Sequence, residues 1–147
     1  MKTFKFIAIS FIAIAFFYSC TINEHPSDVY EESWYVEEFT VKNWKLVGAP
    51  DAPGSYFEYV YANIPLDPAY FDGIITAYIY ENYDTPAERQ LPLPHTYYEL
   101  DNNVPYSVQY TYELRPNNTI AFKVYVSDYY TAGFNPGIIT FRLTIIW

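Results

Sequence analysis

The sequence predicts an all-β protein: a single antiparallel β-sandwich of about seven strands, after a cleaved signal and a short tether, with a small β-barrel as the alternative. Three observations lead to this class. Apolar and polar residues alternate in short runs, which is the period of a half-buried strand. Turn-forming residues, including 11 prolines and 5 glycines, separate the runs. Tyrosine, which favours strands, occurs 18 times.

Residues 1–19 have the features of an export signal. Lys2 and Lys5 precede an apolar run over residues 6–17, and the small Ser19 ends the segment. About a dozen apolar residues are too few to cross a bilayer core of roughly 30 Å as a helix. We therefore expect this segment to be removed rather than to remain as a membrane anchor.

Cys20, the only cysteine, directly follows this segment. Its position resembles the lipobox of bacterial lipoproteins, in which the cysteine carries lipid and the peptide is cut just before it; Phe17 and Tyr18 depart from that motif. An ordinary signal with an incidental cysteine is the alternative, but it leaves a lone thiol unexplained. Acyl chains on Cys20 would anchor the protein, since each buried methylene contributes about 0.8 kcal/mol. We expect an outer-membrane lipoprotein of a bacterial cell envelope.

Residues 20–32 are polar and acidic without periodicity, which predicts a flexible tether. Acidic residues soon after Cys20 resemble the surface-export signals of Bacteroidetes lipoproteins; a plain linker is the alternative. Loss of Lys2 and Lys5 with the signal makes the mature chain more acidic than the −9 of the whole sequence. Such a surface repels nucleic acid and anionic headgroups, so we expect no nucleic-acid partner and attachment through acyl chains.

The all-β domain spans residues 33–147. Alternation predicts strands over residues 34–41 (with a continuation at 44–46), 56–62 and 74–81. Between the last two, residues 67–73 place Asp67, Pro68 and Gly73 where a helix begins and ends, which predicts one helical turn. The strand over 74–81 has two faces, one with Ile75, Ala77 and Ile79 and the other with Thr76, Tyr78 and Tyr80.

The second half of the domain ends in a hairpin and a final strand. Strand pieces over 89–93 and 96–100 contain or flank Pro92 and Pro94, so this segment is expected at a sheet edge, where a missing backbone donor is tolerated. A turn at residues 116–118 joins two alternating runs. The apolar face of that hairpin comprises Val108, Tyr110, Tyr112, Leu114, Ile120, Phe122, Val124 and Val126. Alternation at 139–145 predicts the last strand.

Several short motifs along the domain occur in a familiar order. They are Phe39-Thr40-Val41, Asn43-Trp44, Gly73-Ile74-Ile75, Tyr78-Ile79-Tyr80, Leu91-Pro92 and the closing run from Phe141 to Ile146. In this order they resemble a group of small Bacteroidetes lipoproteins over most of residues 34–147. The resemblance implies an envelope location and a β-sandwich-like fold. It implies no activity and no functional residue.

Histidine-based and metal-based chemistry is poorly supported. His25 lies in the tether, and His95 adjoins Pro94, so both are expected to be solvated loop residues rather than members of a triad. Zinc needs three or four cysteine or histidine ligands, but the one cysteine is expected to carry lipid and one of the two histidines lies in the tether. Asp67 and Asp72 could share a calcium ion across one helical turn, although a capping role explains Asp67 as well. We expect no metal and no cofactor.

A carboxylate pair for glycoside hydrolysis requires two acids facing one cleft. Glu37 and Glu38 are adjacent in a strand and so point to opposite faces. No catalytic constellation stands out, and we expect the protein not to be an enzyme.

The tyrosines carry the one binding signal. Tyr78, Tyr80 and Tyr125 lie opposite apolar strand faces and could form an aromatic platform for a glycan, a peptide or an envelope protein. Alternatively they cover a sheet, with cross-strand pairs worth about 0.2–1 kcal/mol each. Two function classes follow: a non-catalytic surface binding module, or a structural or assembly subunit of an envelope or fimbrial complex. A concave aromatic patch would favour the first, and an unpaired hydrophobic edge strand the second.

Overall fold

The computed structural model describes residues 34–62, 64, 73–116 and 118–146, all within the compact unit Glu32–Trp147. These residues form strands and turns without a helix. The strands are β1 (Trp34–Val41), β2 (Lys45–Val47), β3 (Tyr56–Ala62), β4 (Ile74–Glu81), β5 (Arg89–Pro92), β6 (His95–Asp101), β7 (Val104–Arg115), β8 (Thr119–Val126) and β9 (Ile139–Ile146). Within this part, no helix is long and apolar enough to cross a membrane.

Several expectations fall outside the described residues. These are the signal over 1–19, the tether with Cys20 over 20–32, and the helical turn with Asp67 and Asp72, of which only Gly73 is described.

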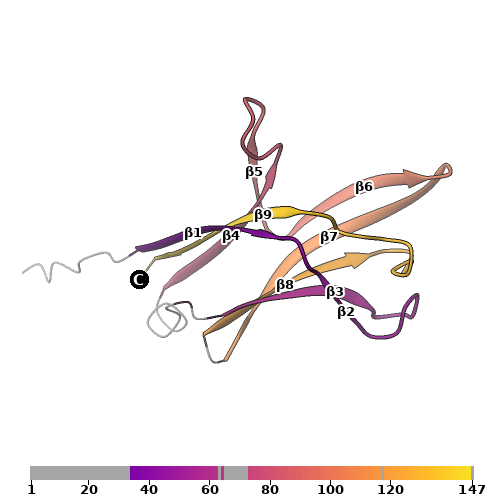
Figure 1. The fold of residues 1–147 in the computed structure, drawn as a ribbon, viewed down its shortest axis with the longest axis horizontal. Helices are drawn as coiled ribbons and strands as arrows, with labels where there is room; N and C mark the ends of the chain where they lie inside the picture. The colour runs from indigo at the N-terminus through magenta and orange to yellow at the C-terminus, as the bar shows by residue number, and fades with distance from the viewer. Residues whose placement is uncertain (1–33, 63, 65–72, 117, 147) are drawn as a thin grey trace, which may run out of the picture. The chain divides into compact units, whose positions relative to one another are not determined.

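The nine strands form two antiparallel sheets (Figure 1). One has four strands in the order β1-β9-β4-β5, and the other has five in the order β2-β3-β8-β7-β6. The C-terminal strand β9 lies between β1 and β4, so segments far apart in the sequence are neighbours. The expected all-β sandwich is confirmed, with two strands more than the sequence pattern predicts.

Aromatic and branched side chains fill the space between the sheets. The rings of Phe122 on β8 and Phe141 on β9 lie 4.6 Å apart, and Phe39 on β1 stacks on Tyr61 of β3 at 4.3 Å. Alternation causes this arrangement, because every second residue of a strand points to the same side. Full burial of each large apolar side chain stabilises the fold by about 1.5–3 kcal/mol.

The hairpin expected near residue 117 is confirmed as β7–β8. Tyr110 pairs with Val124, and Tyr112 with Phe122, so their side chains share the core face. Asn118 has a φ of 55°, a left-handed conformation that asparagine tolerates. Six of the eight residues assigned to this face are buried. The other two, Tyr112 and Leu114, are partly buried and pack against the core.

The expectation that residues 44–46 continue the first strand is wrong. After β1 the chain leaves the four-stranded sheet, and β2 pairs with β3 in the other sheet. Trp44 explains the crossing, because its ring contacts both Phe141 and Tyr59, and its Nε1 donates a hydrogen bond to the Gly137 carbonyl at 3.0 Å.

The proline-containing segment occupies sheet edges, as expected. Its two strands belong to different sheets: β5 forms one edge of the four-stranded sheet, and β6 forms one edge of the five-stranded sheet. The chain passes from one to the other at Leu93 and Pro94, which are joined by a cis peptide bond. This crossing brings β6 to the margin of the sandwich, next to the candidate site.

Candidate functional site

The three tyrosines expected to form a platform do not share one surface. Tyr78 and Tyr80 project from β4 away from the core residues Ala77 and Ile79, on the outer face of the four-stranded sheet. Tyr125 projects from β8 on the outer face of the five-stranded sheet, where its ring lies 5.1 Å from that of Tyr56. The outer faces of a sandwich are on opposite sides, so these tyrosines cannot contact one ligand together.

Tyr80 is also buried, with 8% of its surface exposed, so the expectation that it is solvent-exposed is wrong. Its hydroxyl donates a hydrogen bond to Glu38 on β1, on the far side of β9. The Tyr83 ring packs edge-on against it at 5.1 Å. Burial, followed by the bond to Glu38, raises the pKa of Tyr80 to about 12. Alternation correctly gave the face of Tyr80 but not the residues that cover it.

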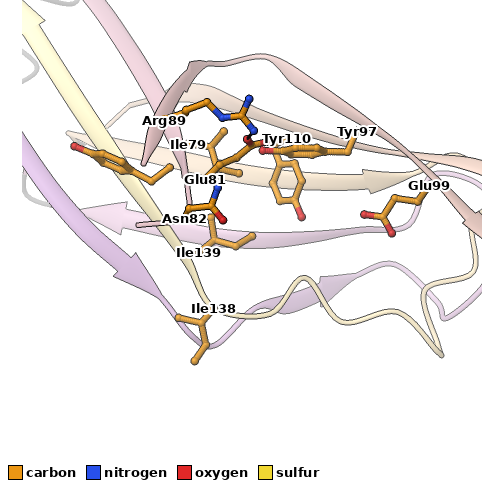
Figure 2. A pocket seen from close by; sticks show the side chains of 10 residues that line it. Ile79, Glu81, Asn82, Arg89, Tyr97, Glu99, Tyr110, Ile138 and Ile139 are labelled. Carbon is orange, nitrogen blue, oxygen red and sulfur yellow. Dashed lines mark ion pairs between the residues drawn. The ribbon is translucent and has the colours of Figure 1, made fainter. Parts of the chain in front are cut away.

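A cleft of about 480 Å³ lies where β4 ends and β6 and β7 pass beside it (Figure 2). Small-molecule sites have volumes of roughly 300–1,000 Å³, so this cleft is large enough for a sugar ring or an amino-acid side chain. It is lined by Ile79, Tyr80, Glu81, Asn82, Arg89, Tyr97, Glu99, Tyr110, Ile138 and Ile139. Apolar side chains from β4 and β9 form one part of the wall, and tyrosines from β6 and β7 form another.

An ion pair closes one side of the cleft. Arg89 on β5 pairs directly with Glu81 on β4 in the sheet register, and its Nη2 lies 2.6 Å from Glu81 Oε2. In Figure 2 the Tyr97 hydroxyl points toward this pair. Burial, followed by a hydrogen bond to Glu81, raises the pKa of Tyr97 well above its ordinary value. Tyr97 therefore stays neutral and its hydroxyl keeps its proton.

Two tyrosine rings stand at the centre of the cleft. The Tyr97 and Tyr110 centroids are 5.7 Å apart with an interplanar angle of 86°, an edge-to-face pair. His95, which the sequence placed in a solvated loop, instead begins β6 and packs its ring against Tyr97 at 4.6 Å. His95 is also the residue that pairs with Tyr110 in the register of β6 and β7, so it lies beside both tyrosines without lining the cleft itself.

Tyr110 differs from Tyr97 because its hydroxyl has no partner among the residues that the structure describes. Only 8% of the residue is exposed, and within the described part of the chain no hydrogen bond to this hydroxyl is formed. Among the same residues no polar side-chain atom is both fully buried and without a partner, so the Tyr110 oxygen is not completely enclosed, and Tyr110 is one of the residues that line the cleft. Burial, with the nearby charge of Glu99 as the next cause, raises its pKa to about 12.

The arrangement offers hydrogen-bond donors, acceptors and aromatic faces, which suits reversible binding. The described residues contain no group of three histidine, cysteine or acidic side chains placed to hold a metal ion. Sequence reasoning assigned Tyr110 to the core and gave Tyr97 no role, because only the pairing of β6 with β7 places the two rings together. No protein-family model, curated protein or solved structure matches this chain.

Proposed function

We propose that this protein is a lipid-anchored component of the bacterial cell envelope, held in the outer membrane by acyl chains on Cys20. Its β-sandwich is a non-catalytic binding module for a glycan, a peptide or a partner protein. The position of Cys20 after a short apolar run supports the anchor. The tyrosine-lined cleft between the sheets supports the binding role, and it is the observation on which that role mainly rests.

The chemistry of the cleft suits a polar ligand with some apolar surface. Tyr97 and Tyr110 each present a flat apolar ring with a hydroxyl at its end, so they can contact carbon atoms and form hydrogen bonds at once. The hydroxyl of Tyr110, which has no partner in the described part of the chain, favours a ligand, because a nearly buried polar group normally has a partner. An anionic ligand is disfavoured by Glu99 and by the overall net charge of −9.

Array binding with matched variants tests this function. Tyr110→Phe removes one hydroxyl and keeps the ring, so we expect the fold to be retained and binding on a glycan or peptide array to weaken. Tyr97→Ala removes part of the wall, and we expect it to abolish capture. Tyr125→Phe, the same chemical change on the distant outer face, is the control. Unchanged capture by both cleft variants would reject the cleft as the site.

A structural or assembly role is the second candidate, and one observation favours it. The edge strand β6 exposes Tyr98 (86%) and Leu100 (70%), and such a strand can pair with a subunit of a complex. Cross-linking in intact cells separates the two roles. A stable complex that survives Tyr97→Ala but is lost when Tyr98 and Leu100 are both changed to lysine would favour the assembly subunit.

A further inference from the structure

The edge strand β6 has two chemically different faces. Glu99 and Asp101 alternate with Tyr98 and Leu100, so the two carboxylates project to one side and the two apolar side chains to the other. All four residues are exposed. β6 pairs with β7 along one side, and among the described strands none pairs with its other side.

Glu99 contributes an uncompensated negative charge at the cleft. Of the three charged side chains that line it, Arg89 and Glu81 neutralise each other at 2.6 Å. Glu99 accepts a hydrogen bond of 2.7 Å from the neutral hydroxyl of Tyr106 and forms no ion pair within the described part of the chain. A cation beside Glu99 would be attracted by this negative charge and would not have to displace another cation.

Tyr110 gives a second, independent indication of a ligand at the same place. Only 8% of the residue is exposed, and it lines the cleft with a hydroxyl that has no hydrogen-bond partner among the described residues. In Figure 2 this hydroxyl points away from the Arg89–Glu81 pair, on the side of the cleft where Glu99 lies. A hydroxyl oxygen can accept a hydrogen bond from an ammonium group, and neutral tyrosine rings attract cations to their faces.

From this arrangement we infer that β6 binds an extended basic peptide by strand addition, with a lysine side chain of the peptide entering the cleft between Glu99 and Tyr110. This inference rests on the proposed binding function and narrows its ligand to a peptide. Side chains opposite each other on paired strands lie about 4.5–5.5 Å apart at Cβ, so a lysine opposite Glu99 is its direct neighbour. A second lysine two positions along meets Asp101.

The apolar face of β6 completes the match. In an added strand the residues between the lysines point to the opposite side, where Tyr98 and Leu100 can cover apolar side chains. A second copy of this chain fits less well, because antiparallel pairing of two β6 strands would bring Glu99 and Asp101 close to the same acids of the other copy. Like charges placed opposite each other destabilise a sheet.

The test uses purified full-length protein in a neutral detergent and the peptide Val-Lys-Val-Lys-Val, blocked at both ends. The matched probe carries acetyl-lysine at both positions, which keeps the alkyl stem of the side chain, adds an acetyl group and removes the charge. We expect the acetylated peptide to bind about tenfold more weakly at low salt, because it loses two exposed ion pairs. Amide hydrogen exchange of β6 should slow when the lysine peptide is bound.

Variants locate the contact. Glu99→Gln should weaken binding of the lysine peptide by about two- to fivefold and leave the acetylated peptide unaffected. Glu113→Gln is the control, because Glu113 lies on the outer face of β7 with Lys123 and Arg115. Equal binding of both peptides, or binding without protection of β6 amides, would overturn the inference.

The remaining outcomes separate this inference from the proposed function. Capture of glucosamine or of a neutral glycan that depends on Tyr97 and Tyr110, with no peptide binding, would overturn the peptide inference and leave the binding module standing. Absence of any cleft-dependent capture would reject both. A dimer that forms through β6 at micromolar concentration would replace the peptide with a second copy of this chain.

Discussion

The Tyr112 hydroxyl on β7 donates a hydrogen bond of 2.9 Å to the main-chain carbonyl of Ile75 on β4, and so it joins the two sheets of the sandwich. β5 pairs with β4 only from Tyr78 to Glu81, so Ile75 lies beyond that pairing. The Tyr112 ring packs beside Phe122 at 6.4 Å, which places the hydroxyl at the opposite sheet. One side chain thus combines core packing with a bond between layers.

Tyr112 variants separate these two contributions. Tyr112→Phe should lower the free energy of unfolding by about 0.5–1.5 kcal/mol, because it removes the bond to Ile75 and keeps the ring. Tyr112→Ala should cost about 3 kcal/mol, at the lower end of aromatic truncations because the ring is half-buried. Urea unfolding followed by tryptophan fluorescence measures both. If Tyr112→Phe and the wild type are equally stable, the hydrogen bond between the sheets contributes nothing to the free energy of unfolding.

Tyr80 should behave differently from the other two outer-face tyrosines. Tyr80→Ala removes a buried ring together with the bond to Glu38 and the contact with Tyr83, and we expect a loss of about 3 kcal/mol. Tyr78→Ala and Tyr125→Ala remove half-buried rings and should cost about 1 kcal/mol each. Thermal unfolding of the three single variants measures the order of their stabilities. A Tyr80 variant as stable as the Tyr78 variant would contradict the burial of the Tyr80 ring.

Alkaline pH should destabilise the fold through its buried tyrosines. Burial raises the pKa of both Tyr80 and Tyr110 to about 12, whereas an unfolded tyrosine ionises near 10.0. Between these values the unfolded state has released protons that the folded state still holds, so stability is full below pH 10 and falls as the pH rises toward 12. Melting temperature measured from pH 9 to about 12 should show this decline.

Tyrosinate absorbance provides the matching observation at the level of the side chains. In the native protein, part of the absorbance change should occur at a higher pH than for free tyrosine. In denaturant, that part should return to a pH of about 10, where unfolded tyrosine ionises. The double variant Tyr80→Phe, Tyr110→Phe should lose part of the delayed fraction and flatten the decline in melting temperature. A native titration complete near pH 10, without delay, would contradict the raised pKa values.

Cys20 should carry the lipid anchor. Cells grown with labelled palmitate should label the wild-type protein and not the Cys20→Ala variant, because the acyl chains are attached through this residue in the proposed arrangement. The variant should also leave the membrane fraction. Equal label in the two proteins would reject lipidation at Cys20, and Cys20→Ser provides a second substitution of similar size.

Strand positions could be predicted well from the sequence because the two-residue period is a local property. Alternation placed β3, β4, β7, β8 and β9 within about two residues of their ends, and it gave the core face of the β7–β8 hairpin. Asn118 likewise marks its turn through a backbone preference that needs no partner. The acidic composition and the apolar run before Cys20 are also properties of the sequence alone.

The tertiary structure alone decided which tyrosines meet. Alternation assigns a side chain to a face of its strand, but strand order determines its neighbours, and that order depends on contacts between distant segments. Tyr97 and Tyr110 form a cleft because β6 pairs with β7, while Tyr80 is covered because Glu38 lies across β9. The same long-range pairing separates Tyr78 from Tyr125, since the sheets that carry them present their outer faces to opposite sides.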